Sequence, residues 1–135
     1  MPNEFNSEYL PHFSGIDLSQ NRFDKFPVNI LYVNSLNQLI LNSQGYYTDA
    51  AQKKYKRTLV EWPTGLDQHM ALKILEVSGN DLRMIQTFPD NLNKFDVSDN
   101  PNIKMTVPSA IIARMNDGSF LLVYDETQDI TNVNN

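Results

Sequence analysis

The sequence predicts a repeat solenoid of the α/β class, and three observations support this prediction. An apolar pattern recurs along the 135 residues, an Asn stands at one fixed offset within it, and apolar–Pro pairs punctuate the chain. A recurring unit of about 20–29 residues is typical of a solenoid, in which each unit buries its apolar face against its neighbours. We expect one domain over residues 1–135, with about five irregular repeats, as part of a longer chain.

The repeated pattern is LxxLxLxxNxL. Complete copies lie at residues 13–23, 72–82 and 92–103, the last with one extra residue after its Asn. Weaker copies begin at Leu36 and Phe120, with Gln44 and Gln128 where the pattern has Asn. The five starts are spaced by 23, 36, 20 and 28 residues, which indicates an insertion of about a dozen residues in the second unit.

The chemistry of the pattern explains its Asn. The xLxL core forms a short strand whose alternate side chains enter the interior. The chain then turns sharply, which leaves backbone amides and carbonyls without strand partners. A buried Asn offers both a donor and an acceptor to these groups. We therefore expect Asn21, Asn80 and Asn100 to form an internal ladder, in which Gln44 and Gln128 are looser replacements.

The insertion, near residues 46–61, is the locally basic part of the chain. The basic residues that flank Tyr55 are Lys53, Lys54, Lys56 and Arg57. Ala51, Tyr55 and Leu59 are spaced by four residues, which predicts a short helix. Thr48 or Asp49 would cap it. The basic side chains would then point outward, either as an ordinary solvated face or as a contact site for an anionic surface.

Pairs of an apolar residue and Pro mark a second position in the units. Pro follows each of the residues Leu10, Phe26, Trp62, Phe88 and Val107. Proline has no amide hydrogen to satisfy, so it suits the extended stretch where a unit leaves its strand. The repeats, the fixed Asn and these pairs together resemble the leucine-rich-repeat family over residues 10–130. More narrowly, the chain resembles the irregular repeat regions of bacterial surface proteins.

The resemblance implies a curved stack with a parallel sheet on its concave side. It also implies helices or extended turns on the convex side, for which residues 28–35, 65–71 and 109–115 are the candidates. Residues 107–130 resemble the closing unit of such arrays. The chain departs from the family in its few repeats, its lack of a cysteine cap and its disrupted second unit.

In this fold the outward-facing strand residues form the concave surface. One predicted column across the stack contains Asp17, Ile40, Glu76, Asp96 and Tyr124, and its neighbour contains Gly15, Gln38, Ile74, Lys94 and Leu122. The candidate partner-binding residues are Asp17, Ile40, Ile74, Glu76, Lys94, Asp96 and Tyr124. Apolar side chains beside carboxylates suit a protein or peptide that carries basic groups, and the alternative is an ordinary solvated sheet face. Carboxylates on adjacent strands also suit Ca²⁺, but no spacing resembles a calcium loop, so we predict no metal site.

Composition argues against several other functions. The net charge of −5 disfavours nucleic acid as a partner, because phosphate binding needs a basic face. Cysteine is absent, which removes disulfides, thiolate metal sites and cysteine nucleophiles. His12 and His69 are the two histidines, and neither has the spacing of a metal ligand. No nucleotide-binding or hydrolase motif is present, so we expect no enzyme activity and no cofactor. No run approaches the roughly 20 apolar residues of a membrane span.

The sequence thus favours a non-enzymatic scaffold that binds a protein or peptide through its concave face. The alternative is a structural spacer or terminal cap of a larger bacterial surface protein with no ligand of its own. The resemblance implies a location at a bacterial cell surface, although the N-terminal residues show no signal peptide. Because a solenoid end needs a cap and residues 1–12 offer only Phe5, Tyr9 and Leu10, we expect either self-association through the N-terminal end or marginal stability.

Overall fold

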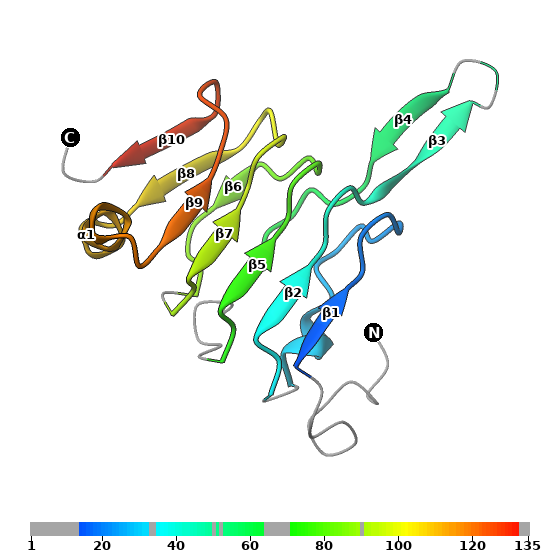
Figure 1. Ribbon diagram of the computed structural model, residues 1–135. Helices are drawn as coiled ribbons and strands as arrows, with labels where there is room; N and C mark the ends of the chain where they lie inside the picture. The colour runs from blue at the N-terminus through cyan, green and yellow to red at the C-terminus, as the bar shows by residue number, and fades with distance from the viewer. Residues whose placement is uncertain are drawn as a thin grey trace.

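The computed structural model of the protein describes residues 14–32, 35–49, 51, 53–63, 71–89 and 91–132. Within these ranges the largest sheet is parallel and has five strands, in the order β1 (Gly15–Asp17), β2 (Gln38–Ile40), β5 (Ile74–Glu76), β7 (Lys94–Asp96) and β9 (Leu121–Val123). Figure 1 shows these strands side by side in the order of the repeats. One short strand per repeat in a single parallel sheet is the arrangement of a solenoid, so the predicted fold class is confirmed.

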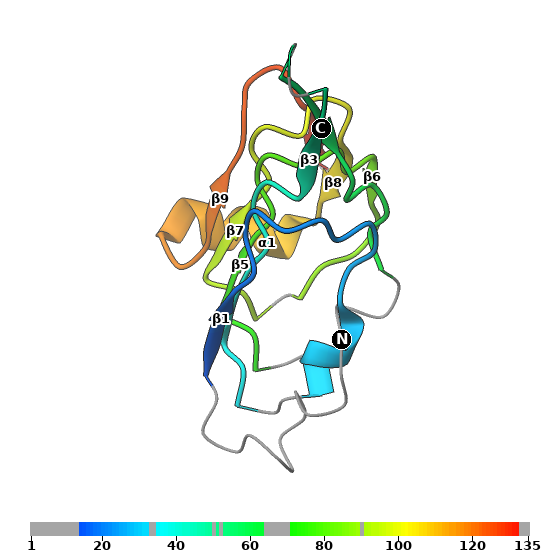
Figure 2. The ribbon, with the colours of Figure 1, turned by 90° about the vertical axis from the view of Figure 1, so that its right-hand side faces the viewer.

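A smaller parallel sheet lies across the interior from the first. In the described part of the chain it contains β10 (Asp129–Asn132), β8 (Lys104–Val107) and β6 (Met84–Ile85), paired in that order. Figure 2 shows the two sheets nearly edge-on, on opposite sides of the core. The later repeats therefore have two β walls with apolar side chains between them.

Two helices lie among the described residues. A 3₁₀ helix, η2 (Val28–Tyr32), falls within the predicted convex segment 28–35, and α1 (Ser109–Asp117) covers the predicted segment 109–115. Residues 64–70, which make up most of the third predicted segment, are outside the described ranges. No helix in these ranges is long and apolar enough to cross a membrane.

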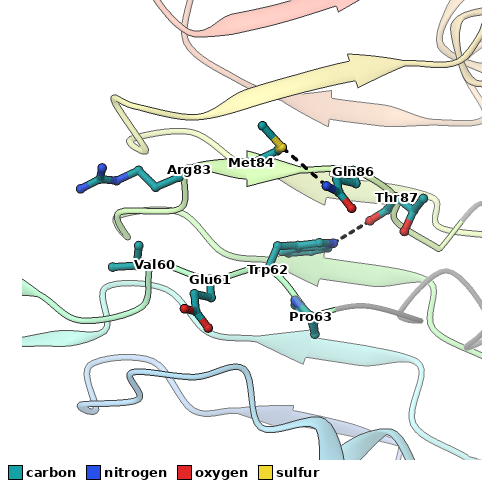
Figure 3. Close-up of a pocket in the computed structure, with 8 residues that line it drawn as sticks. All are labelled: Val60, Glu61, Trp62, Pro63, Arg83, Met84, Gln86 and Thr87. Atoms are coloured by element: carbon teal, nitrogen blue, oxygen red, sulfur yellow. Dashed lines mark hydrogen bonds between the residues drawn. The ribbon is translucent and has the colours of Figure 1, made fainter.

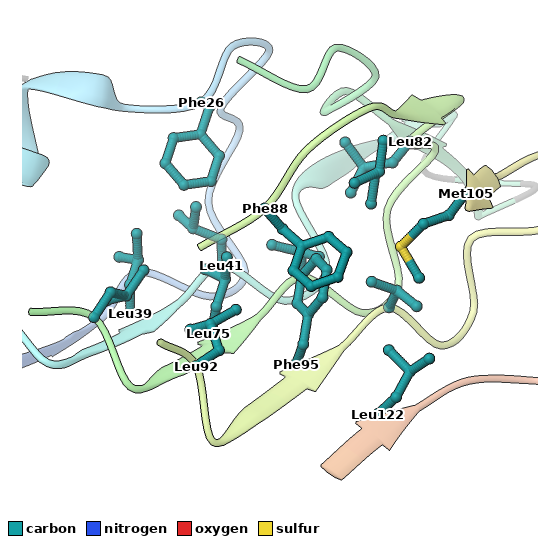
Figure 4. Close-up of a cluster of buried hydrophobic side chains, with 14 of the residues drawn as sticks. Phe26, Leu39, Leu41, Leu75, Leu82, Phe88, Leu92, Phe95, Met105 and Leu122 are labelled. Carbon is teal, nitrogen blue, oxygen red and sulfur yellow. The ribbon is translucent and has the colours of Figure 1, made fainter. Parts of the chain in front are cut away.

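An aromatic cluster runs along the core. The ring centroids of Phe26 and Trp62 are 5.8 Å apart, those of Trp62 and Phe95 are 5.6 Å apart, and those of Phe95 and Phe88 are 5.1 Å apart. Phe120 extends the cluster from Phe88 at 6.1 Å. Figure 4 shows Phe88 and Phe95 among the strand leucines of successive repeats. Three of the residues that precede a Pro thus belong to this cluster, which explains the recurring apolar–Pro pair.

Asn80 and Asn100 form the ladder that satisfies the buried turns. Both side chains have no solvent exposure. The Asn80 side-chain amide donates to the Leu41 carbonyl of the preceding repeat at 3.0 Å and to the Val77 carbonyl of its own at 2.8 Å. Its oxygen accepts from the backbone N–H of Gln44 at 2.9 Å. Asn100 makes the equivalent donations one unit later, to the carbonyls of Val77 and Val97, and accepts from the N–H of Leu82 at 3.0 Å, so each amide joins its own turn to the turn before it.

The two glutamines take the same role with a longer side chain. Gln44 is fully buried, donates to the Leu18 carbonyl at 2.7 Å and accepts from the Phe23 N–H at 3.1 Å. Gln128 donates to the Val97 carbonyl at 2.7 Å, but it accepts from the N–H of Asp125 in its own repeat. The ladder therefore spans four consecutive repeats of the described chain.

The prediction that Asn21 is internal is wrong. Its side chain is exposed, and within the described ranges its amide donates to the carbonyls of Leu18 and Ser19 in its own turn. The ladder amides of Gln44, Asn80 and Asn100 also reach the carbonyls of the preceding repeat, whereas the amide of Asn21 is used within one turn. Asn21 holds its turn but does not join two turns.

The residue before the Asn or Gln of the repeat pattern adopts a left-handed conformation in the first four repeats. The φ angles are +60° at Gln20, +59° at Ser43, +70° at Gly79 and +54° at Asp99. This conformation lets the backbone N–H point along the stack, and the N–H of Ser43 donates to the Ser78 carbonyl at 2.9 Å. Three of these four positions hold residues with side chains, although glycine adopts positive φ at a lower energy.

The predicted helix in the insertion is wrong, because the segment is a β-hairpin. Strands β3 (Gly45–Asp49) and β4 (Lys54–Arg57) pair antiparallel and project from the stack, as Figure 1 shows. Tyr47 faces Tyr55 across the hairpin, with ring centroids 5.1 Å apart. Tyrosine and threonine favour strands, and cross-strand aromatic pairs stabilise them, so β structure prevails over the four-residue spacing.

The hairpin is inserted without disturbing the repeat. It begins at Gly45 and ends at Arg57, and the N–H of Thr58 donates to the Gln44 carbonyl at 3.1 Å to close its base. When residues 45–57 are set aside, the second repeat has the same length as the first. Leu59 then enters the core where Leu82 does in the next complete unit.

Candidate interaction surfaces

The outward face of the five-stranded sheet is the concave face of the predicted solenoid. Its parallel register aligns Asp17, Ile40, Glu76, Asp96 and Val123 in one column, and Gly15, Gln38, Ile74, Lys94 and Leu121 in the other. Figure 1 looks onto this face, and no described helix or strand crosses it. Six of the seven candidate residues therefore lie together on one exposed surface.

The predicted position of the seventh candidate, Tyr124, in this column is wrong. The register pairs Asp96 with Val123, and Tyr124 follows the end of β9 with 49% of its surface exposed. Likewise Leu122 points into the core, and Leu121 takes its predicted place with 56% exposure. The strand lies one residue earlier than predicted because Leu122 enters the core two residues after the buried Phe120, where the repeat pattern has a spacing of three.

At the centre of the concave face, polar contacts within the protein fix the carboxylate of Glu76 in place. One oxygen of Glu76 lies 3.4 Å from the Lys94 ammonium on the next strand, and the other accepts from the Asn42 amide at 3.2 Å. Both oxygens of this half-buried group are thus engaged within the protein. Glu76 is oriented by its neighbours and is a poor candidate for a freely adapting contact residue.

The other two carboxylates of the column bond to the turn that follows their own strand. Asp96 accepts from the N–H and hydroxyl of Ser98 through one oxygen, at 3.0 and 2.7 Å. Asp17 accepts from the N–H of Ser19 at 2.9 Å, and hydrogen bonding with the side chain and backbone of Ser19 holds the pKa of Asp17 below its usual value. In each case the second oxygen has no hydrogen-bond partner within the described ranges, so these carboxylates remain able to meet a basic group.

Apolar side chains lie between these charges. Ile40 and Ile74 occupy neighbouring strands and are half-buried, and Leu121 with Val123 extends the apolar surface at the far end. Their diagonal placement on adjacent strands puts the two isoleucines within reach of one another. The concave face therefore combines apolar contact area with oriented carboxylates, as the sequence predicted.

A second surface lies between the hairpin and the turn of the first repeat. It is a groove of about 600 Å³, lined by Gln20, Arg22, Ser43, Gly45, Tyr46, Tyr47 and Tyr55. The Arg22 guanidinium stacks on the Tyr46 ring, 4.9 Å from its centroid. The sequence indicated the tyrosines and lysines of the insertion, but it did not indicate that Arg22 joins them.

A third groove, of about 440 Å³, lies beside β6 on the other side of the molecule. Figure 3 shows the Trp62 indole at its floor, with the ring N–H donating to the Thr87 carbonyl at 2.6 Å. Arg83 on its wall is paired with Asp81 at 2.9 Å. The Trp62 and Arg83 side chains of this groove are thus engaged within the protein, while Glu61 on its rim is exposed.

Within the described ranges, no group of three or more His, Asp or Glu side chains is placed to hold a metal ion. His12 and His69 lie outside those ranges, as do Phe5, Tyr9 and Leu10, on which the predicted N-terminal self-association depends.

The solved structures to which this chain is similar include two leucine-rich repeat proteins. One is a leucine-rich repeat protein from Bacteroides thetaiotaomicron, which is 31% identical with a TM-score of 0.85 over 98% of this chain. The other is a leucine-rich repeat protein from Bacteroides eggerthii, which is 35% identical with a TM-score of 0.82 over 96% of this chain. The present chain spans 15% and 20% of the lengths of these two proteins. No family model matches the chain. No curated protein matches it at a significant level.

Proposed function

We propose that this chain, which has the leucine-rich-repeat fold, is a protein-interaction scaffold whose concave face contacts a protein or peptide. The observation that carries the proposal is the five-stranded sheet, whose outer face no described helix or strand covers and on which Ile40 and Ile74 lie between oriented carboxylates. An apolar patch rimmed by charged groups is typical of contact surfaces between proteins.

The charges of this face suggest the chemistry of the partner. Its two columns contain three carboxylates, of Asp17, Glu76 and Asp96, and one ammonium, of Lys94, so the difference is a net charge of −2. A partner that combines basic and apolar side chains would therefore complement it. An extended peptide or an exposed loop with this composition meets the requirement.

Selection from a randomised peptide library tests this proposal and requires no assumption about the identity of the partner. Peptides selected on the wild-type chain are measured by fluorescence anisotropy against Ile40→Lys/Asp96→Asn, which keeps a hydrogen-bond acceptor for Ser98. The matched control is Met84→Lys/Asp129→Asn on the smaller sheet, which changes the net charge by the same amount at exposed positions. Both variants are checked for unchanged circular dichroism.

We expect selected peptides rich in Lys or Arg with aliphatic residues. The concave-face variant should weaken their binding by about tenfold or more, because it removes both charge complementarity and apolar contact, while the control changes it less than about twofold. Equal binding by all three proteins would contradict the concave site. A library that yields no enriched peptide would favour the spacer function instead.

A bacterial cell surface is the setting that we propose for this scaffold. Antibody labelling of intact and permeabilised cells of the source organism tests it. Labelling of intact cells is the expected result, and labelling that requires permeabilisation would contradict it.

A further inference from the structure

The β3–β4 hairpin is held to the stack in one orientation. Arg57, at its base, donates to both carboxylate oxygens of Asp99 at 2.9 and 3.0 Å. It also donates to the backbone carbonyls of Asp99 and Asn80 at 2.7 and 2.9 Å. The Thr58 hydroxyl donates to the Phe23 carbonyl at 2.8 Å on the other side of the base. The arm is thus clamped to the repeats before and after it.

This fixed arm presents tyrosine rings to solvent. Tyr47 is 64% exposed and Tyr55 is 41% exposed, and the two rings meet edge to face at 66°. The Tyr55 hydroxyl donates to the Ser43 carbonyl at 2.8 Å. Its ring lies over Gly45, where an added Cβ would come within 2.8 Å of the Tyr55 ring carbon Cζ. Rings that are oriented but uncovered lose little conformational entropy when a partner packs on them.

Arg22 adds an oriented cation to the same groove. Its guanidinium stacks on Tyr46, and no described carboxylate lies within ion-pair distance of it. Stacking on a ring leaves the N–H edge of a guanidinium available to a carboxylate, with its direction already set. The groove therefore has a directed donor at one wall and tyrosine rings at the other.

The hairpin also concentrates positive charge on an acidic molecule. Lys53, Lys54 and Lys56 are exposed and make no ion pair with any described residue, whereas the chain as a whole has a net charge of −5. A strong local reversal of sign steers a short anionic ligand to this arm.

We propose that the groove between the hairpin and the turn at Gln20–Arg22 binds an acidic peptide segment of a partner protein. A carboxylate of the peptide pairs with Arg22, an apolar side chain packs on Tyr47 and Tyr55, and further carboxylates meet the lysines of the arm. This site is separate from the concave face and does not rest on the function proposed for it.

The charge distribution favours a short acidic peptide over nucleic acid. A long polyanion of uniform charge would extend past the arm and meet the net negative charge of the remaining molecule. A short peptide contacts only the local cations, and its apolar side chains match the exposed rings. The groove volume of about 600 Å³ accommodates a few side chains rather than a folded domain.

The test is a binding measurement with a fluorescein-labelled peptide built from repeated Glu-Glu-Leu units, on the full chain. Wild type is compared with Arg22→Gln/Tyr47→Ala, and the matched control is Arg83→Gln/Met84→Ala, which removes the same charge and exposed apolar surface beside β6. The Ile40→Lys/Asp96→Asn variant separates this site from the concave face. A repeated Lys-Lys-Leu peptide and an oligothymidylate of matched length are the other probes.

We expect the acidic peptide to bind, and its affinity to fall steeply as salt rises from about 0.05 to about 0.3 M. Arg22→Gln/Tyr47→Ala should weaken binding by about tenfold or more, while the control and the concave-face variant remain within about twofold of wild type. Absence of peptide binding, equal binding by the Arg22→Gln/Tyr47→Ala variant, or tighter binding of the oligothymidylate would each overturn the proposal.

Discussion

Single side-chain amides connect the repeats of this protein. Asn80 and Asn100 each bond to two neighbouring turns, and Gln44 shows that a longer amide also reaches the preceding turn. The repeat pattern predicted these positions because a sharp turn leaves a buried N–H and carbonyl at one fixed offset. It did not predict that Asn21 is exposed and bonds within its own turn, because the burial of a turn depends on what packs against it and is not visible in a local motif.

Removal of a ladder amide should destabilise the fold according to its burial. Asn80→Ala leaves the Gln44 N–H and the Leu41 carbonyl without their partner in the core, and we expect a loss of about 2–4 kcal/mol in the free energy of unfolding. Asn21→Ala removes hydrogen bonds to the carbonyls of Leu18 and Ser19 at an exposed site, where water can replace them. The loss in the free energy of unfolding should therefore be about 1 kcal/mol or less. Urea denaturation followed by circular dichroism measures both. Similar losses for the two variants would contradict the ladder account.

Two substitutions at the left-handed turn positions should change the free energy of unfolding in opposite directions. Gln20→Gly relieves an unfavourable φ of +60° at an exposed site and should raise the free energy of unfolding by about 0.5–1 kcal/mol. Gly79→Ala should lower it by about 1–2 kcal/mol, because φ is +70° and the new Cβ would lie 2.7 Å from the Ser43 hydroxyl oxygen. Thermal unfolding of the two variants beside wild type checks the signs. A stabilised Gly79→Ala protein would be incompatible with this description of the turn.

At the scale of elements, the hairpin shows where sequence reasoning succeeded and failed. The long spacing of the second unit indicated an insertion, and its expected size was close to that of the hairpin, which occupies residues 45–57. Its secondary structure was predicted wrongly. The spacing of four among Ala51, Tyr55 and Leu59 fits a helix, but in so short a segment such a spacing also arises by chance. The hairpin is stabilised instead by pairing across strands, which a local periodicity does not detect.

Deletion of the hairpin should leave the solenoid folded. Removal of residues 45–57 joins Gln44 to Thr58 and Leu59, which reproduces the spacing of Asn80, Asp81 and Leu82. We expect circular dichroism of the deletion variant to retain the parallel-sheet signal and its unfolding to remain cooperative, while binding of the acidic peptide is lost. A molten or aggregated deletion variant would show that the hairpin is part of the core structure rather than an addition to it.

At the scale of the whole molecule, the repeat pattern predicted the stack and most of its concave surface. Inward and outward positions alternate along each strand, so the apolar spacing placed Asp17, Ile40, Ile74, Glu76, Lys94 and Asp96 on the same face. The last strand was predicted one residue too late, since Leu121, Leu122 and Val123 are all apolar and the local spacing does not decide which of them points inward.

The groove beside the hairpin was beyond sequence reasoning for a different reason. Arg22 and Tyr46 are far apart in the sequence and belong to different repeats, and they meet only because the stack brings successive turns together. A surface formed by the same position in successive repeats can be predicted from a repeat motif. Surfaces made between an insertion and a neighbouring turn require the folded molecule.

The central claim is that the concave face is the contact surface, and an NMR footprint tests it most directly. A peptide selected from the library is added to the isotope-labelled chain, and changes in backbone amide shifts are mapped onto the two sheets. We expect the largest changes in β2, β5 and β7, around Ile40 and Ile74, with small changes in β6, β8 and β10. The reverse distribution, with the largest changes on the smaller sheet, would contradict the claim.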